Sequence, residues 1–134
     1  MNPVEKYGLI KNNENGYGGN IGSASLGFQN EVYCETSVAL GVKNKIEKEP
    51  ANCFCSGVIA AGRLNIARGN GVAAIGLNNK VDYINWGQEG GSIGLGAYNE
   101  ISQIEQTGKY QNLTGALALG SHNLIKNNNV EESL

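Results

Sequence analysis

The chain has 134 residues and a formal net charge of −2, from ten basic side chains, twelve acidic side chains and one histidine treated as neutral. This length predicts a single domain. The basic residues are interleaved with acidic ones, which excludes binding to nucleic acid through its phosphates. Glycine accounts for 20 residues, about twice its average share, as is typical of a chain that turns every few residues.

An internal repeat dominates the sequence between residues 20 and 126. Six times a glycine is followed three residues later by asparagine and five residues later by an apolar residue. In chain order the pairs are Gly27/Asn30, Gly41/Asn44, Gly62/Asn65, Gly76/Asn79, Gly96/Asn99 and Gly120/Asn123. Their regular spacing predicts an all-β solenoid of about 14-residue coils. We expect 1–19 to form an N-terminal cap or partial coil, 20–126 a six-coil roll, and 127–134 a polar tail.

The residues before each repeat glycine alternate in character, which predicts a strand with two different faces. We expect parallel strands at about 23–26, 37–40, 58–61, 72–75, 92–95 and 116–119, and a second strand after each asparagine. The large apolar residues are expected inside the coil; they are Leu26, Leu40, Ile75, Leu95 and Leu119. The small residues of the other face are expected against a neighbouring chain; they are Ser25, Ala39, Ala60, Ala74, Gly94 and Ala118.

The repeat asparagines are expected at turns, since asparagine tolerates positive φ angles and its amide bonds to nearby backbone. Stacked in successive coils, their side chains would form a ladder.

Three insertions interrupt the 14-residue spacing, near 47–56, 82–90 and 102–114, and all three leave the repeat at the same point. Insertions of this kind form loops on one face of a solenoid. Aromatic and amide side chains suit a contact surface, so the insertions provide the candidate ligand-binding residues. These are Tyr83, Asn85, Trp86, Gln88 and Tyr110. Alternatively the aromatic residues, with Phe54, cover the edge of the roll as hydrophobic lids.

Cys34 and Cys55 each lie seven residues before a repeat glycine, so we expect them at equivalent places in successive coils. The spacing of stacked strands would allow a disulfide, but we expect reduced, packed thiols. Together with Cys53 they provide three thiols without a fourth ligand, so no metal site is predicted. The single histidine, His122, lies in a turn and is expected to be exposed. The sequence contains no catalytic constellation, and we expect a protein that is not an enzyme and needs no cofactor.

The run SVALG followed by two residues and asparagine, with the related runs GVAAIG and GALALG, resembles the YadA-like head repeats of trimeric autotransporter adhesins. The resemblance covers about residues 20–126. It implies a left-handed parallel β-roll, a homotrimer and an adhesive role at the bacterial cell surface. The implied partner is host extracellular matrix, a cell-surface receptor or a glycan.

Anchoring to the outer membrane is expected from other parts of a longer chain. The sequence shows no secretion signal and no apolar segment long enough to span a membrane, so no direct membrane insertion is predicted. The alternative is a trimeric phage or virion fibre module, which also needs a rigid trimer.

Overall fold

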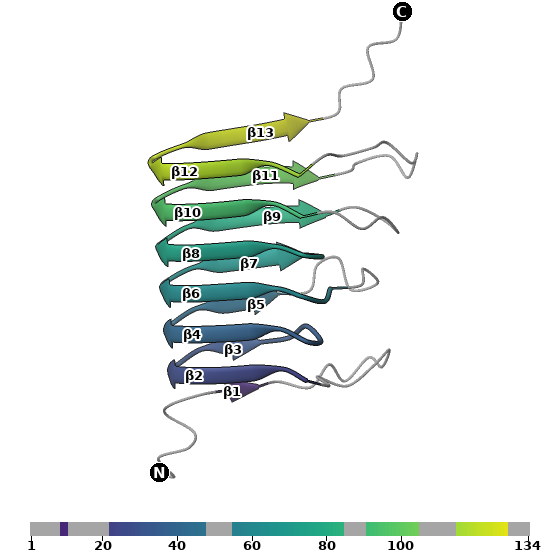
Figure 1. Ribbon diagram of the computed structural model, residues 1–134, viewed down its shortest axis with the longest axis vertical. Helices are drawn as coiled ribbons and strands as arrows, with labels where there is room; N and C mark the ends of the chain where they lie inside the picture. Colours follow the sequence, from purple (N-terminus) through teal and green to yellow (C-terminus); the bar gives the residue numbers. More distant parts are fainter. Residues whose placement is uncertain (1–8, 11–21, 48–54, 85–90, 105–114, 129–134) are drawn as a thin grey trace, which may run out of the picture.

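The computed structural model describes residues 9–10, 22–47, 55–84, 91–104 and 115–128. These residues form strands and turns, with no helix among them. The strands belong to two parallel sheets that lie face to face, and the chain passes from one sheet to the other once in every half coil (Figure 1).

We call the seven-stranded sheet, in the order β1-β3-β5-β7-β9-β11-β13, sheet A. Its strands are β1 (Leu9–Ile10), β3 (Glu31–Val32), β5 (Lys45–Glu47), β7 (Ile66–Gly69), β9 (Lys80–Ile84), β11 (Glu100–Ile104) and β13 (Leu124–Asn128). We call the six-stranded sheet, in the order β12-β10-β8-β6-β4-β2, sheet B. Its strands are β2 (Ala24–Phe28), β4 (Val38–Val42), β6 (Ile59–Arg63), β8 (Ala73–Leu77), β10 (Ile93–Ala97) and β12 (Leu117–Ser121).

Residues at equivalent positions of the sequence repeat pair with each other in the sheets. In sheet B, Gly27 pairs with Gly41, Gly41 with Gly62 and Gly62 with Gly76. The predicted parallel strands are confirmed, although those of sheet B begin and end one or two residues later than expected. A second strand follows each repeat asparagine directly, as predicted.

The repeat glycines are required by backbone geometry at the turn. Gly62 has a φ of +115°, and a Cβ atom there would overlap the carbonyl oxygen of Gly76 in the next coil. Gly27, Gly41, Gly76 and Gly96 have the same conformation and the same close approach. Only a residue without a side chain fits such a position.

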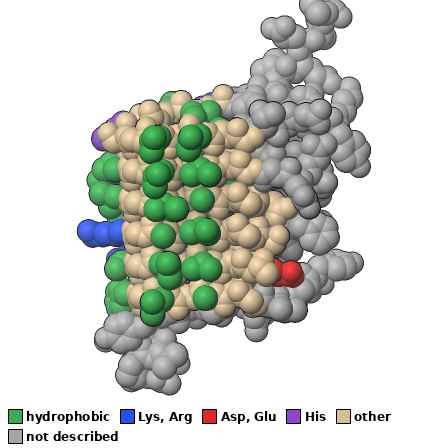
Figure 2. All heavy atoms as spheres, in the orientation of Figure 1, with side chains coloured by type: hydrophobic (Ala, Val, Ile, Leu, Met, Phe, Trp, Pro, Cys, Tyr) green, Lys and Arg blue, Asp and Glu red, His purple; other side chains and the backbone are tan. Residues whose placement is uncertain are grey.

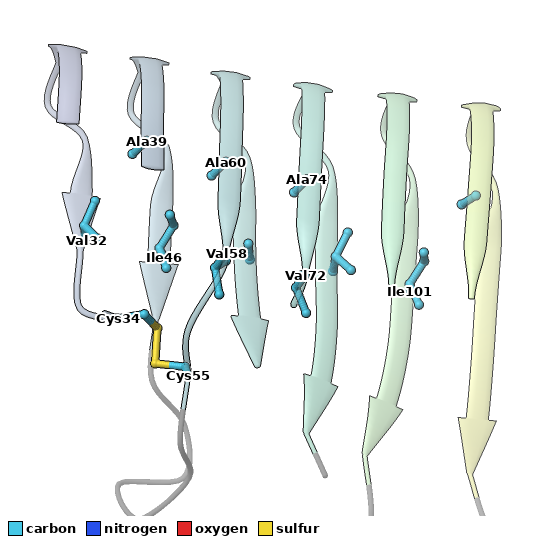
Figure 3. Packing of buried hydrophobic residues seen from close by; sticks show 13 residues of the cluster. Val32, Cys34, Ala39, Ile46, Cys55, Val58, Ala60, Val72, Ala74 and Ile101 are labelled. Atoms are coloured by element: carbon cyan, nitrogen blue, oxygen red, sulfur yellow. A yellow bond between two sulfur atoms is a disulfide. The ribbon is translucent and has the colours of Figure 1, made fainter. Parts of the chain in front are cut away.

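The assignment of the two faces of sheet B from the sequence is wrong. Ala39, Ala60 and Ala74 have no exposed surface and point into the layer between the sheets (Figure 3). Leu26 is 72% exposed and Leu119 is 66% exposed. Leu40 and Leu95 are also exposed and Ile75 is half-buried, so the large apolar residues form the outer face.

The thinness of the coil explains this inversion. Sheet A fills most of the interior with branched side chains such as Val32, Ile46 and Ile101, all fully buried. Little room remains opposite them: a Cβ atom at Gly94 would lie 2.8 Å from Cγ2 of Val81. Because interiors are close-packed, the inward positions of sheet B accept only small residues.

The cysteines confirm the predicted register but not the predicted redox state. Cys34 and Cys55 are neighbours, with 5.2 Å between their Cα atoms, and they form a disulfide (Figure 3). Both are buried, so the bridge lies within the core beside Val58. The expectation of reduced thiols is wrong, because stacking at this distance brings the two sulfur atoms together. Cys53 lies outside the described residues.

Candidate functional site

The asparagine ladder is complete and has no free capacity for a ligand in the middle of the roll. The Nδ2 of Asn65 donates to Oδ1 of Asn44 at 3.0 Å, to the carbonyl of Ala61 at 2.9 Å and to the carbonyl of Gly76 at 2.8 Å. Its own Oδ1 accepts from the backbone N and the Nδ2 of Asn79, both at 3.0 Å. The ladder therefore stabilises the stack of coils, as predicted.

The outer face of sheet A carries a network of charged side chains. Arg68 Nε lies 2.8 Å from Asp82 Oδ1 and 3.4 Å from Glu47 Oε2. Lys45 Nζ lies 2.6 Å from Glu47 Oε1, and Lys80 Nζ lies 3.6 Å from Asp82 Oδ2. Cations and anions alternate here, which gives a face suited to water and not to a ligand of one charge sign.

Asp82 is the most buried member of this network, at 3% exposure. Burial raises the pKa of its carboxyl above the usual value, and the Arg68 and Lys80 cations oppose that shift. The ionised form of Asp82 is thus held in the fold at a cost in desolvation.

The outer face of sheet B is apolar and flat. Two outward register positions in each strand form two columns of hydrophobic side chains along the roll (Figure 2). These twelve residues, which we call the apolar face, are Ala24, Leu26, Val38, Leu40, Ile59, Ala61, Ala73, Ile75, Ile93, Leu95, Leu117 and Leu119. No charged residue belongs to it. Large exposed apolar patches are typical of contact surfaces, so this face is a candidate site.

A second feature lies where the sheet B strands end and the chain turns into sheet A. We call this the turn edge; it consists of 28–29, 42–43, 63–64, 77–78, 97–98 and 121–122. The second residue of each pair has a left-handed backbone, with φ between 52° and 60°. Asn78 suits that conformation, whereas Leu64 and Tyr98 adopt it at a cost of about 1–2 kcal/mol each.

Most side chains of the turn edge are exposed, whereas Phe28, Leu77 and Ala97 are half-buried. Tyr98 is 47% exposed and Leu64 is 38% exposed. The ring of Tyr98 stacks on that of His122, with 5.1 Å between the ring centroids. His122 is exposed, as predicted. Hydrophobic side chains line this edge beside the apolar face (Figure 2).

The residues proposed from the sequence as ligand-binding lie mostly outside the described residues. Asn85, Trp86, Gln88 and Tyr110 are all outside, as is Phe54. Tyr83 lies in β9, in register with Gly69 of β7 and Gln103 of β11. Residues 82–84 and 102–104, expected in insertions, are instead the ends of β9 and β11.

The sequence analysis did not identify the apolar face and the turn edge as candidate surfaces. Their signal in the sequence was the two apolar positions before each repeat glycine, which were assigned to the interior. A leucine and a tyrosine at turn positions that favour asparagine or glycine were a second signal.

Over the described ranges, no group of three or more His, Cys, Asp or Glu side chains could hold a metal ion. Within the same part of the chain, no helix is long and apolar enough to cross a membrane. Comparison of the chain with protein-family models, with curated proteins and with solved structures finds no match.

Proposed function

We propose that this chain is the non-catalytic head of a trimeric bacterial surface adhesin, folded as a left-handed β-roll. The observation that carries the proposal is the apolar face. The outer face of sheet A is charged and suits contact with water. The outer face of sheet B is uncharged and apolar and suits burial against a partner. The resemblance of the repeat motifs to YadA-like heads supports two further copies of the same chain as the cover.

The disulfide supports a location outside the cytosol. Cys34 and Cys55 form a buried bridge, and structural disulfides persist mainly in oxidising compartments. An exported adhesin meets that condition at the cell surface. A phage or virion fibre assembled in a reducing cytosol does not, so the bridge favours the adhesin over this alternative.

The proposed partner is a host matrix protein, a cell-surface receptor or a glycan, bound through the insertions. The regular coils repeat one pattern with little variation, whereas the insertions differ from each other. We therefore retain Tyr83, Asn85, Trp86, Gln88 and Tyr110 as the proposed contact residues.

The experiment is a binding array of matrix proteins, cell-surface receptors and glycans, probed with the wild-type chain and with Trp86→Ala. Wild type should bind at least one class saturably, and Trp86→Ala should weaken that binding about tenfold without lowering the melting temperature. Tyr33→Ala is the matched aromatic control, since Tyr33 directly follows β3 in the regular coils and its hydroxyl donates to Glu31. Absence of binding to all three classes would contradict the proposal. So would retained binding by a Trp86→Ala variant of much lower melting temperature, which would make Trp86 a lid.

A further inference from the structure

One turn of the roll carries a residue that its backbone disfavours. Thr36 lies two residues before β4 and has a φ of +45°, in the left-handed region. At the same place before the other five strands of sheet B the residue is glycine; these are Gly22, Gly57, Gly71, Gly91 and Gly115. A β-branched residue at such an angle is a genuine outlier. Thr36 is exposed, so burial does not offset the strain.

The same turn is the one that the disulfide joins to the next coil (Figure 3). We call residues 34–37 the bridged turn. Cys34 lies two residues before Thr36, and its partner Cys55 lies two residues before Gly57, which is the equivalent of Thr36 in the next coil. Within the described ranges, no second pair of coils is joined in this way. The unfavourable residue and the covalent bridge therefore occur in the same turn.

The hydrogen bonds printed across the bridged turn are long. Three of them have donor–acceptor distances of 3.2 Å; they run from Glu35 N to Cys55 O, from Gly57 N to Thr36 Oγ1 and from Val58 N to Ser37 Oγ. The bond from Val38 N to Val58 O, where β4 begins, is 2.9 Å long. Regular pairing of the two coils in sheet B thus starts only beyond the turn, and the bridge is the main restraint on the turn itself.

We propose that the Cys34–Cys55 bridge is a redox-sensitive switch of the bridged turn. The bridge holds residues 34–37 against 55–58 with Thr36 in its left-handed conformation. A dithiol reduces it: the S–S bond breaks, each cysteine sulfur gains one hydrogen, and the dithiol loses two hydrogens as it closes into its own disulfide. The turn then separates from 55–58 and Thr36 takes a negative φ, while the strands of both sheets stay paired. The switch is a property of one chain and does not depend on the proposed adhesin function.

The test is the redox equilibrium of the full chain carrying Thr36→Asn or Thr36→Val, in mixtures of reduced and oxidised dithiothreitol. Both variants lack the hydroxyl that accepts from Gly57, and they differ in strain, because asparagine suits the left-handed turn and valine is β-branched. If the strain exists only in the bridged form, its relief favours that form. The ratio of reduced to oxidised dithiothreitol that opens half of the bridges should be about tenfold higher for Thr36→Asn. All chains carry Cys53→Ser, so that thiol labelling reports the two bridge cysteines alone.

The matched control is the same pair of substitutions at Gln29. This residue also has a left-handed backbone, with a φ of +52°, but it lies in the turn between β2 and β3, away from the bridge. Gln29→Asn and Gln29→Val should open at equal ratios. Equal ratios for the two Thr36 variants would overturn the switch, because the strain would then be independent of the bridge. A difference at Gln29 as large as that at Thr36 would overturn it too.

Nuclear magnetic resonance of the wild-type chain shows what reduction does to the fold. Backbone couplings should report a positive φ for Thr36 before reduction and a negative one after it. The contact between Glu35 and Ser56 should disappear, whereas that between Lys45 and Ile66, which joins the same two coils in sheet A, should remain. A positive φ that persists after reduction overturns the switch. So does loss of the Lys45–Ile66 contact, since the bridge would then stabilise the whole roll, and so does a wild-type chain without the bridge.

Discussion

At the scale of single residues, two side-chain requirements recur in every coil: no side chain at the repeat glycine and an amide three residues later. The glycine carbonyl accepts a bond from the asparagine of the preceding coil, as between Asn44 Nδ2 and Gly62 O at 3.0 Å. The glycine thus permits the close approach of the backbones, and the asparagine joins them. Each requirement predicts a specific loss in the free energy of unfolding when the residue is substituted.

Gly62→Ala should lower the free energy of unfolding by more than about 3 kcal/mol, because the new Cβ overlaps the Gly76 carbonyl and the backbone has φ +115°. The matched control is Gly57→Ala, where φ is +64° and nothing lies within 4 Å of the added atom. This change should cost only about 1–2 kcal/mol. Urea denaturation of both variants checks the difference, and equal losses would contradict the close approach.

Asn79→Ala should cost about 3 kcal/mol, since the buried acceptor Asn65 Oδ1 and the part-buried acceptors Ile75 O and Gly96 O all lose an amide donor. Asn123→Ala, at the last coil, should cost about 1 kcal/mol because its bond to Leu119 O is exposed. Chemical denaturation measures both variants. A terminal substitution as costly as the central one would refute the stacking argument.

Asp82→Asn should be better tolerated at neutral pH than in acid. Burial raises the pKa of Asp82 above its ordinary value of 3.8, so its protonated form is favoured by folding. The stability that this group contributes is fully present below pH 3.8 and is lost as the pH rises through the raised pKa. The difference in unfolding free energy between wild type and Asp82→Asn should therefore shrink from acid to neutral pH. A difference that grows with pH, in denaturation series on both proteins, would contradict this.

At the scale of elements, the disulfide joins the segment that follows β3 to the one that precedes β6, across 21 residues of sequence. This span includes β4, β5 and the first insertion. The bridge therefore reduces the conformational freedom of the unfolded chain around the first insertion.

Replacement of Cys34 and Cys55 together by serine should lower the free energy of unfolding by about 3 kcal/mol. The measurement is denaturant unfolding with and without reductant, and reductant should affect the wild type alone. Thiol labelling is the independent check. Three reactive thiols in the unfolded, unreduced wild type would show that the bridge is absent.

The elements also show how far the sequence alone could predict this structure. The Gly-x-x-Asn spacing located both strands of each coil, and it placed Cys34 beside Cys55, because equal positions in a solenoid stack. Which face of sheet B is buried could not be predicted from residue size. A period of two separates two faces, but which face is buried depends on the opposing sheet, and Val81 leaves room only for Gly94.

The candidate site was predictable only in part for the same reason. Leu64 and Tyr98 stand at turn positions that any solenoid would expose, yet their role depends on what covers the neighbouring apolar face. A single sequence contains no direct signal of a second copy. The ion pairs on the outer face of sheet A involve basic and acidic residues that are interleaved in the sequence.

At the scale of the whole molecule, the outer face of sheet B is apolar (Figure 2), and the outer face of sheet A carries ion pairs. The buried and exposed faces of sheet B are the reverse of those expected, so different substitutions are needed to test assembly. Ala74, once expected at the interface, is fully buried inside the chain. Ala74→Arg should therefore unfold the single chain, whereas a charged residue at Leu95 should act on assembly.

Leu95→Lys should leave the melting temperature of the isolated chain nearly unchanged, because Leu95 belongs to the exposed apolar face. It should prevent assembly, since a buried lysine without a partner is strongly unfavourable. Circular dichroism at low concentration and size-exclusion chromatography at high concentration separate the two effects. A variant that unfolds at low concentration would contradict the placement of this face.

The most direct measurement is the mass of the wild-type protein in solution at micromolar concentration, by sedimentation equilibrium. If two further copies cover the apolar face, the mass is three times the 14.1 kDa of one chain and falls only on dilution. A mass of 14.1 kDa across that range would contradict the central claim, because the apolar face would then be stable in water without a partner.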